Sequence, residues 1–185
     1  VVRESTNIFE RYSGFKLLKY KLAYWIGYNK IDLVITQTQI MGEILLKKVP
    51  YLQKRVRIVT IPNPFEFPRN PIIPVDDTIK GEYIVSAGRF IPEKGFDLLL
   101  TAYSNIKKKY PDLKLVLLGD GRLKDNLLKI VEDLNIRDGV CFLGFVENVY
   151  PYFQRAQVCV VSSRVEGFPN VLLQMMSQND RVVST

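Results

Sequence analysis

The chain has 185 residues, a length that suggests one domain, or one domain plus part of another. Of these residues 47% are hydrophobic and 24% charged, a composition typical of a soluble globular protein. No stretch approaches the ~18 consecutive apolar residues of a membrane-spanning helix, and no signal-peptide pattern is present, so we expect no spanning protein. Histidine is absent, which excludes Ser/His and Cys/His nucleophile pairs and His-ligated zinc within this chain.

The net charge of +7 is concentrated at the start of the chain, because residues 1–70 hold 12 Lys/Arg and 5 Asp/Glu, whereas residues 71–185 hold 14 of each. This asymmetry indicates an anionic partner, which is a membrane surface, a phosphate-bearing substrate or nucleic acid. The two cysteines, Cys141 and Cys159, are too few for a disulfide framework and lie in apolar, strand-like runs. We therefore expect buried, reduced thiols and a cytoplasmic protein.

The first third of the chain predicts a partial α/β domain. Apolar residues recur at helical spacing from Tyr12 to Ile26 and predict a helix over 10–28. The elements expected after it are a strand at 32–36, a helix at 37–48 and a second strand at 56–61. The opening VVREST, without an initiator Met, predicts that the chain is cut from a longer protein.

Five prolines between residues 62 and 74 exclude a helix or a central strand there. They predict a hinge over 62–80. The expected organisation is a partial domain over 1–61, this hinge, and a second domain over 81–185 that is truncated at its C-terminal end.

The second domain predicts a regular alternation of strands and helices. Apolar strands are expected at 83–87, 114–118, 140–143, 158–161 and 181–184. Helices are expected between them at 95–109, 122–135, 149–155 and 169–178. This pattern predicts a Rossmann-like parallel sheet with helices on both faces, in which ligands bind at the carboxyl ends of the strands.

The first two loops at those strand ends are suited to phosphate. In AGRFIPEKGF, Arg89 and Lys94 flank a turn between the strand-ending Gly88 and a helix start, where a diphosphate would meet two cations and free amides. The alternative is two solvated surface cations. In LLGDGRL, Gly119 and Gly121 would let the backbone approach a ligand, or they form an ordinary turn.

The last two loops are expected to complete the site. The loop LGFVENV could present backbone groups to a nucleobase or serve as a plain connector. In SSRVEGFPNVLLQMM, Glu166 precedes Pro169, which suits the first turn of the next helix, and the backbone amides of Asn170 to Leu172 at the start of that helix would be available to a ligand. Glu166 either contacts a hydroxylated ligand whose phosphate these amides hold, or only caps the helix.

The four loops, in this order and spacing, resemble the C-terminal half of the family 4 retaining glycosyltransferases, which have the GT-B fold. The stretches that carry the resemblance are AGRFIPEKGFDLLLTAY, KLVLLGDGRLKDNLL and SSRVEGFPNVLLQMMSQNDRVVST. The resemblance is strong over 83–185. It is looser over 31–63, which resembles the end of that family's N-terminal domain and its hinge.

The resemblance implies a role for each loop. Arg89 and Lys94 would bind the donor diphosphate and stabilise the leaving group, while Glu166 would contact the transferred sugar as a candidate catalytic carboxylate. The amides of Phe168 to Leu172, Pro169 excepted, would hold the diphosphate, and the loop around Phe145 would meet the base. The donor-binding residues so expected are Gly88, Gly119, Gly121, Phe145, Gly167, Phe168, Pro169, Asn170, Val171, Leu172 and Gln174.

Two departures from the family pattern concern activity. Gln174 stands where the family has a second glutamate that binds the ribose, so we expect weaker nucleotide binding. The family's N-terminal domain holds the acceptor site and usually a catalytic histidine, so this chain alone is expected not to turn over. The resemblance implies no cofactor and no metal, and the sequence contains no Asp-x-Asp pair that could hold a cation–diphosphate complex.

The helix predicted over 10–28 mixes aromatic and cationic residues, as at Tyr24, Trp25 and Lys21. Such a mixture suits an anionic membrane surface, while the alternative is a helix packed in the rest of its domain. Nucleic acid is not expected, because no binding module is recognisable.

The function expected is transfer of a hexose from a nucleotide sugar, a UDP-sugar rather than a GDP-sugar, to a glycan or lipid-linked acceptor in surface polysaccharide synthesis. The expected location is the cytoplasm, peripheral at the inner face of the membrane. Two alternatives stay open, namely a non-catalytic nucleotide-binding or scaffold module and a nucleotide-sugar epimerase.

Overall fold

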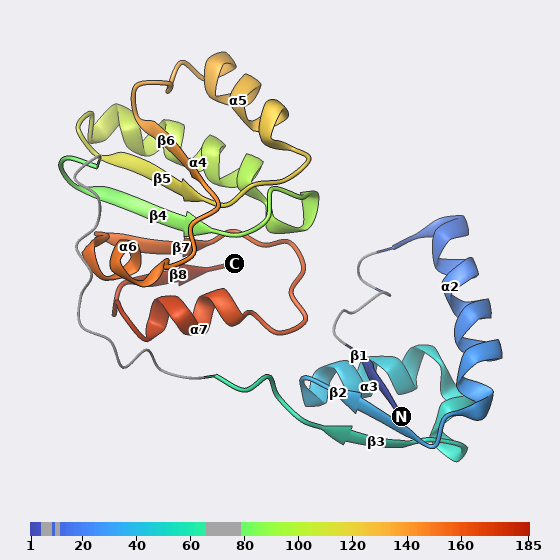
Figure 1. The fold of residues 1–185 in the computed structure, drawn as a ribbon. Helices are drawn as coiled ribbons and strands as arrows, with labels where there is room; N and C mark the ends of the chain where they lie inside the picture. Colours follow the sequence, from blue (N-terminus) through green and yellow to red (C-terminus); the bar gives the residue numbers. More distant parts are fainter. Residues whose placement is uncertain (5–8, 10–11, 66–78) are drawn as a thin grey trace. The chain divides into compact units, whose positions relative to one another are not determined.

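The structure, a computed structural model, describes residues 1–4, 9, 12–65 and 79–185 (Figure 1). The chain forms two compact units, one of Val1–Pro64 with Val165–Pro169 and the other of Phe65–Arg164 with Asn170–Thr185. Most of the predicted hinge and residues 10 and 11 of the first predicted helix lie outside the described residues.

The first unit is built on a parallel sheet of three strands in the order β1-β2-β3. The strands are β1 (Val2–Glu4), β2 (Leu33–Thr36) and β3 (Arg57–Thr60), and the helices are α2 (Gly14–Gly27) and α3 (Gln39–Lys48). Thr38 caps α3 by accepting a hydrogen bond from the Met41 amide at 3.2 Å. The core of the unit joins Tyr24 of α2 to Val34 of β2 and Leu45 of α3.

Strand β1 was not predicted, because three residues are too few to show an alternating pattern. It pairs in parallel with β2, and the Tyr28 hydroxyl donates a hydrogen bond to the Glu4 carboxylate at its end. Burial and this carboxylate together raise the pKa of the Tyr28 hydroxyl above its ordinary value. The short strand is therefore held by pairing and by a tertiary contact, neither of which local sequence reveals.

The second unit contains a five-stranded sheet in the order β6-β5-β4-β7-β8, in which every neighbouring pair is parallel (Figure 1). The strands are β4 (Tyr83–Ala87), β5 (Lys114–Leu118), β6 (Val140–Gly144), β7 (Val158–Val161) and β8 (Val182–Ser184). Each lies within one residue of its predicted range, because strands buried on both faces read as continuous apolar runs.

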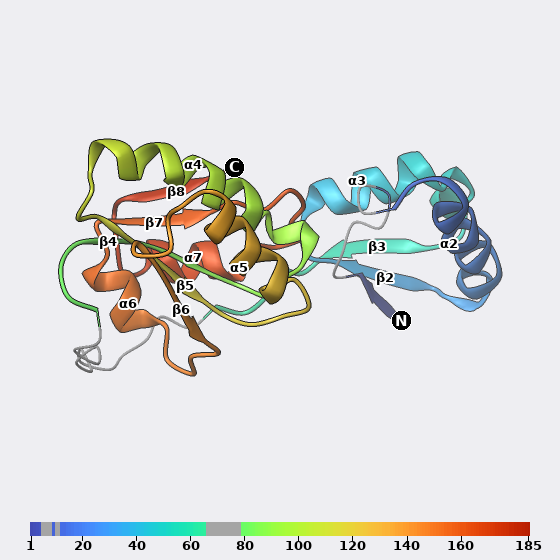
Figure 2. The ribbon, with the colours of Figure 1, turned by 90° about the horizontal axis from the view of Figure 1, so that it is seen from above.

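Helices cover both faces of this sheet, as Figure 2 shows for α4 and α6. The helices are α4 (Phe96–Lys109), α5 (Lys124–Asp133), α6 (Tyr150–Arg155) and α7 (Asn170–Met176), each within two residues of its predicted bounds. Along β4, Ile84 faces the core beneath α4 and α5, whereas Tyr83 and Val85 face the core beneath α6 and α7. The predicted Rossmann-like architecture is confirmed.

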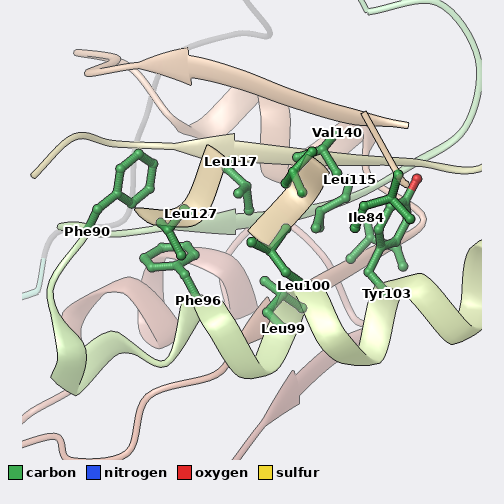
Figure 3. Packing of buried hydrophobic residues seen from close by; sticks show 12 residues of the cluster. Ile84, Phe90, Phe96, Leu99, Leu100, Tyr103, Leu115, Leu117, Leu127 and Val140 are labelled. Atoms are coloured by element: carbon green, nitrogen blue, oxygen red, sulfur yellow. The ribbon is translucent and has the colours of Figure 1, made fainter. Parts of the chain in front are cut away.

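The core beneath α4 and α5 is a layer of large side chains from these two helices and from three strands (Figure 3). Leu100 and Tyr103 of α4 are fully buried, Leu100 beneath Leu115 of β5 and Tyr103 beside Ile84 of β4. The Tyr103 hydroxyl donates to the Leu113 and Gly139 carbonyl oxygens at 2.7 and 3.0 Å, so its polar end is satisfied. This packing fixes the direction in which α4 leaves the sheet.

Both cysteines are free, Cys159 fully buried in β7 and Cys141 half-buried in β6. Burial raises the pKa of the Cys159 thiol to about 12, so the thiol is protonated and weakly reactive near neutral pH. No helix among the described residues is long and apolar enough to cross a bilayer.

Candidate functional site

The order of the strands creates a topological switch point beside β4. The chain runs from β4 through β5 to β6 on one side of the sheet, then returns to β7 and β8 on the other side. The loops after β4 and β7 therefore leave neighbouring strands toward opposite faces. In open parallel sheets, the crevice at such a point is where ligands bind.

Backbone hydrogen bonds join the loops after β4, β5 and β6 at the carboxyl edge of the sheet. The Gly88 amide donates to the Leu118 carbonyl oxygen at 2.9 Å, and the Phe90 amide donates to the Asp120 carbonyl oxygen at 2.9 Å. The Gly119 amide donates to the Gly144 carbonyl oxygen at 2.7 Å. Three of the four loops predicted to form the site are thus adjacent.

The glycines of the second loop have a role that the sequence did not suggest. A Cβ at Gly119 would lie 2.0 Å from the Gly88 carbonyl oxygen, and one at Gly121 would lie 2.7 Å from the Phe90 carbonyl oxygen. Both positions therefore exclude side chains because two loops pack backbone to backbone there. Close approach of a ligand at these glycines stays a prediction.

The loop after β7 is tied to the loop after β4 by Arg164. Its guanidinium donates to both carboxylate oxygens of Asp97 at 2.8 and 2.6 Å and to the Pro92 carbonyl oxygen at 2.9 Å. Its backbone amide donates to the Glu93 carbonyl oxygen at 2.7 Å. Through its hydrogen bonds, the Arg164 guanidinium holds the pKa of the Asp97 carboxyl below its ordinary value.

Ser162 and Gly95 complete the same junction. The Ser162 hydroxyl donates to the Lys94 carbonyl oxygen at 3.0 Å, while a Cβ at Gly95 would lie 2.0 Å from the Ser162 carbonyl oxygen. Gly95 has a φ of +62°, a backbone conformation that L side chains rarely adopt. The two loops thus meet along a short stretch of backbone that admits no side chain at Gly95.

The two predicted phosphate-binding cations lie in the loop that this network holds. Arg89 is exposed, and Lys94 is half-buried at the end of the short 3-10 helix η3 (Pro92–Lys94). The Lys94 stem crosses Gly88, since a Cβ there would lie 3.7 Å from the Lys94 Cδ. Gly88, Lys94, Gly119 and the backbone around Ser162 are therefore brought together.

The remaining predicted residues fall on adjacent segments of the chain. Glu166, Gly167, Phe168 and Pro169 are half-buried in the segment between β7 and α7, which is grouped with the first unit. The sequence predicted that Pro169 occupies the first turn of this helix. Helix α7 instead begins at Asn170, so Pro169 directly precedes it. A difference of one residue is within the ordinary uncertainty of a helix end.

Within α7, Val171 and Leu172 pack against the second core, and Gln174 is half-buried one turn further along. Phe145 lies directly after β6 and is 83% exposed. Their expected roles toward a nucleotide stay predictions. Among the described residues, no group of three or more His, Cys, Asp or Glu side chains is placed to hold a metal ion.

Three residues of this junction were missed by the sequence reasoning, namely Ser162, Arg164 and Asp97. Asp97 lies in the first turn of α4, where a carboxylate is favourable, so it resembles an ordinary helix-start residue. Arg164 is 67 residues away, and nothing local indicates that the two side chains meet. The sequence offered one indication of this pairing, namely that the loops after β4 and β7 were both expected at the carboxyl edge of the sheet.

Residues 75–185 match the family model described as "Glycosyl transferases group 1". The chain belongs to this family. Its two parallel sheets with helices are those of the GT-B glycosyltransferases, as the resemblance implied.

Relatives in the group 1 family extend the match beyond the second unit. An uncharacterized glycosyltransferase of Methanocaldococcus jannaschii is 31% identical over 172 residues, which cover 89% of this chain and 42% of the relative. An N-acetylgalactosamine-N,N'-diacetylbacillosaminyl-diphospho-undecaprenol 4-alpha-N-acetylgalactosaminyltransferase of Campylobacter jejuni is 32% identical, with 100% of this chain and 50% of the relative covered. The chain thus spans about half the length of these relatives, or less.

Two solved structures show the same fold. One is a mutant of S. aureus TarM in complex with Fondaparinux, alpha-GlcNAc-glycerol and UDP. It has a TM-score of 0.75 and is 24% identical, with 98% of this chain and 36% of the TarM chain covered. The other is the pneumococcal O-GlcNAc transferase GtfA in complex with UDP and GlcNAc, with a TM-score of 0.72 at 22% identity over 90% of this chain and 32% of its own.

Proposed function

We propose that this chain supplies the donor-binding part of a retaining glycosyltransferase, which transfers a hexose from a nucleotide sugar to a glycan or lipid-linked acceptor in surface polysaccharide synthesis. The observation that carries the proposal is the loop holding Arg89 and Lys94. It lies at the switch point of a parallel sheet, inside the segment that matches the group 1 family.

The two cations suit a diphosphate leaving group. During transfer, the bond between the anomeric carbon and the diphosphate oxygen breaks, and negative charge builds on that oxygen. The Arg89 guanidinium offers paired N–H donors and the Lys94 ammonium a point charge, so both interactions strengthen as the bond breaks. The acceptor oxygen forms the new glycosidic bond, and its proton ends on the diphosphate or on solvent.

The proposed roles of the other residues follow from a donor whose diphosphate lies beside Arg89 and Lys94. Glu166 would contact the hydroxyl groups of the transferred sugar, and the backbone amides at the start of α7 would hold the diphosphate. Phe145, exposed after β6, would meet the base. Because two side-chain cations already balance the diphosphate, we propose that binding needs no metal ion and no cofactor.

The comparisons favour one donor and one class of acceptor. The TarM and GtfA structures both contain UDP, which supports a UDP-sugar over a GDP-sugar. The C. jejuni relative is named for a diphospho-undecaprenol-linked acceptor, which supports a lipid-linked glycan. A cytoplasmic location at the inner face of the membrane would fit such an acceptor.

Titration calorimetry with UDP and GDP tests the donor site. We expect UDP to bind, to bind equally well in the presence of EDTA, and to lose at least about tenfold in affinity in Arg89→Ala, as expected for a charge-assisted contact. Arg137→Ala is the matched control, because Arg137 is an exposed arginine in the turn before β6, at the opposite edge of the sheet. Equal losses in both variants would contradict a specific role for Arg89.

A second candidate function, a non-catalytic nucleotide-binding module, is favoured by Gln174 alone. An amide lacks the charge that strengthens hydrogen bonds to ribose hydroxyls. We expect Gln174→Glu to tighten UDP binding severalfold if the site is an attenuated donor site, with Gln178→Glu, just beyond α7, as the control. If no nucleotide binds either form of a longer, active protein, the donor-site proposal fails.

A further inference from the structure

Helix α2 carries two apolar faces, of which one is buried in the core of its unit. Tyr24 is buried and Leu17 half-buried on that side, and the core continues at Tyr28 just beyond the helix. The other face is an exposed stripe, each of whose side chains is between 56% and 71% exposed. The stripe consists of Phe15, Leu18, Leu22, Trp25 and Ile26.

This stripe is a concentration of exposed apolar surface. The five side chains of the stripe are separated by three, four, three and one residues, which places them on one side of an α-helix. Large exposed hydrophobic side chains elsewhere in the described residues, such as Ile40, Leu98 and Val183, are single and lie on different elements. Isolated exposed residues of this kind are ordinary, whereas a contiguous stripe marks an interaction surface.

Lysines border the stripe on both sides. At about 100° per residue, Lys16 and Lys19 fall along one margin and Lys21 along the other, and all three are exposed. The Lys19 ammonium lies 5.0 Å from the centre of the Phe15 ring. Helix α2 contains no acidic residue, so the border is uniformly positive.

This combination distinguishes a bilayer surface from a protein partner. The cores of protein interfaces are depleted in lysine, whereas in-plane membrane helices bury an apolar face while lysines beside it meet anionic headgroups. Tryptophan is enriched at the depth of the headgroups. With 14 residues, α2 is about 21 Å long, too short to span a bilayer but long enough to lie on one.

We propose that α2 docks this unit on a membrane surface rich in anionic lipid, with the stripe entering the headgroup layer and the three lysines contacting lipid phosphates. The docking is independent of the donor site. It would hold the protein at the surface where a lipid-linked acceptor resides, should the proposed function be correct.

Trp25 reports on this face directly, because it is the one tryptophan in the sequence. We expect its fluorescence to shift to shorter wavelength with vesicles of phosphatidylglycerol and phosphatidylcholine, and to be quenched by brominated lipid. Neutral phosphatidylcholine vesicles should produce little change, and added salt should weaken the binding. If anionic vesicles do not shift the fluorescence of Trp25 and the chain does not sediment with them, the proposal is wrong.

Matched variants separate this face from general positive charge. Replacing Lys16, Lys19 and Lys21 together with Gln should weaken vesicle binding on the order of a hundredfold, from about fivefold per lysine near an anionic surface. Replacing Lys47, Lys48 and Lys54, exposed in the same unit, removes the same charge and should have a much smaller effect. Equal losses would overturn the assignment to α2.

The apolar contribution has its own control. Leu22→Ser should weaken vesicle binding, whereas Ile40→Ser, at a comparably exposed position of α3, should not. Circular dichroism checks that each variant folds. If the fluorescence of Trp25 is already blue-shifted in buffer alone, and the mass in solution is twice that of the chain, a second copy covers the stripe. The same shift in a longer form of the protein at monomer mass would assign the stripe to an internal contact, and either result overturns the proposal.

Discussion

Gly95 lies where the loop after β4 meets the loop after β7. Its positive φ and its contact with the Ser162 carbonyl oxygen each exclude a side chain, for separate reasons. The first is a property of the local backbone, and the second depends on a segment far along the chain. Substitution at this position therefore reports on the junction of the two loops.

We expect Gly95→Ala to lower the free energy of unfolding by about 3 kcal/mol or more, because the added Cβ would force the loops apart. Gly81→Ala is the control, since Gly81 also has a positive φ, of +87°, but has nothing within 4 Å of an added Cβ. The control should cost only the conformational strain, about 1–2 kcal/mol. Equal losses in urea unfolding would show that the contact with Ser162 is unimportant.

The bidentate pair between Arg164 and Asp97 joins the start of α4 to the end of β7. Both side chains are more than a third exposed, so solvent screens the pair and its contribution to stability is at most about 1 kcal/mol. Its larger effect is geometric, because the Arg164 guanidinium and amide both hold the loop that carries Lys94.

We expect Arg164→Ala to weaken UDP binding severalfold while changing the melting temperature by only a few degrees. Asp138→Ala is the control, since it removes an ion pair away from the two loops, the one that the exposed Asp138 forms with the half-buried Lys107 at 2.8 Å, near the start of β6. Arg164→Lys should rescue little, because an ammonium cannot bind both carboxylate oxygens in the same geometry. Intact binding in Arg164→Ala would refute a positioning role.

The same pair predicts a pH dependence. The folded pKa of Asp97 is lowered, so its contribution to stability is present above the ordinary aspartate pKa of about 3.9 and is lost as the pH falls through the lower, folded value. The difference in melting temperature between the wild type and Arg164→Ala should therefore vanish in strong acid. A difference that persists there would show that the Pro92 contact, and not the ion pair, is responsible.

Each unit has a core of its own, with fully buried leucines at Leu52 in the first and Leu100 in the second. We expect Leu52→Ala and Leu100→Ala each to cost about 2–5 kcal/mol, as buried truncations do, and each to lower a different transition in scanning calorimetry. A single transition lowered by both variants would show that the two cores unfold as one.

Much of the second unit was predictable because its signals are local. A continuous apolar run such as that of β5 identifies a buried strand, and helical spacing from Phe96 to Tyr103 identifies α4. In contrast, β1 is three residues long, and each of its residues pairs with one that lies 32 residues further along the chain. Its existence depends on a contact that no local window contains.

The sequence by itself determined the alternation of strands and helices, the loops that hold Arg89 and Lys94, and membership of the group 1 family, because periodicity and motif spacing are carried by neighbouring residues. Only the tertiary structure decided the central place of β4, the pairing of Arg164 with Asp97, and the reason for glycine at Gly119. The physical cause is the same in each case, since these features depend on which distant segments lie side by side, and short-range patterns leave that choice open.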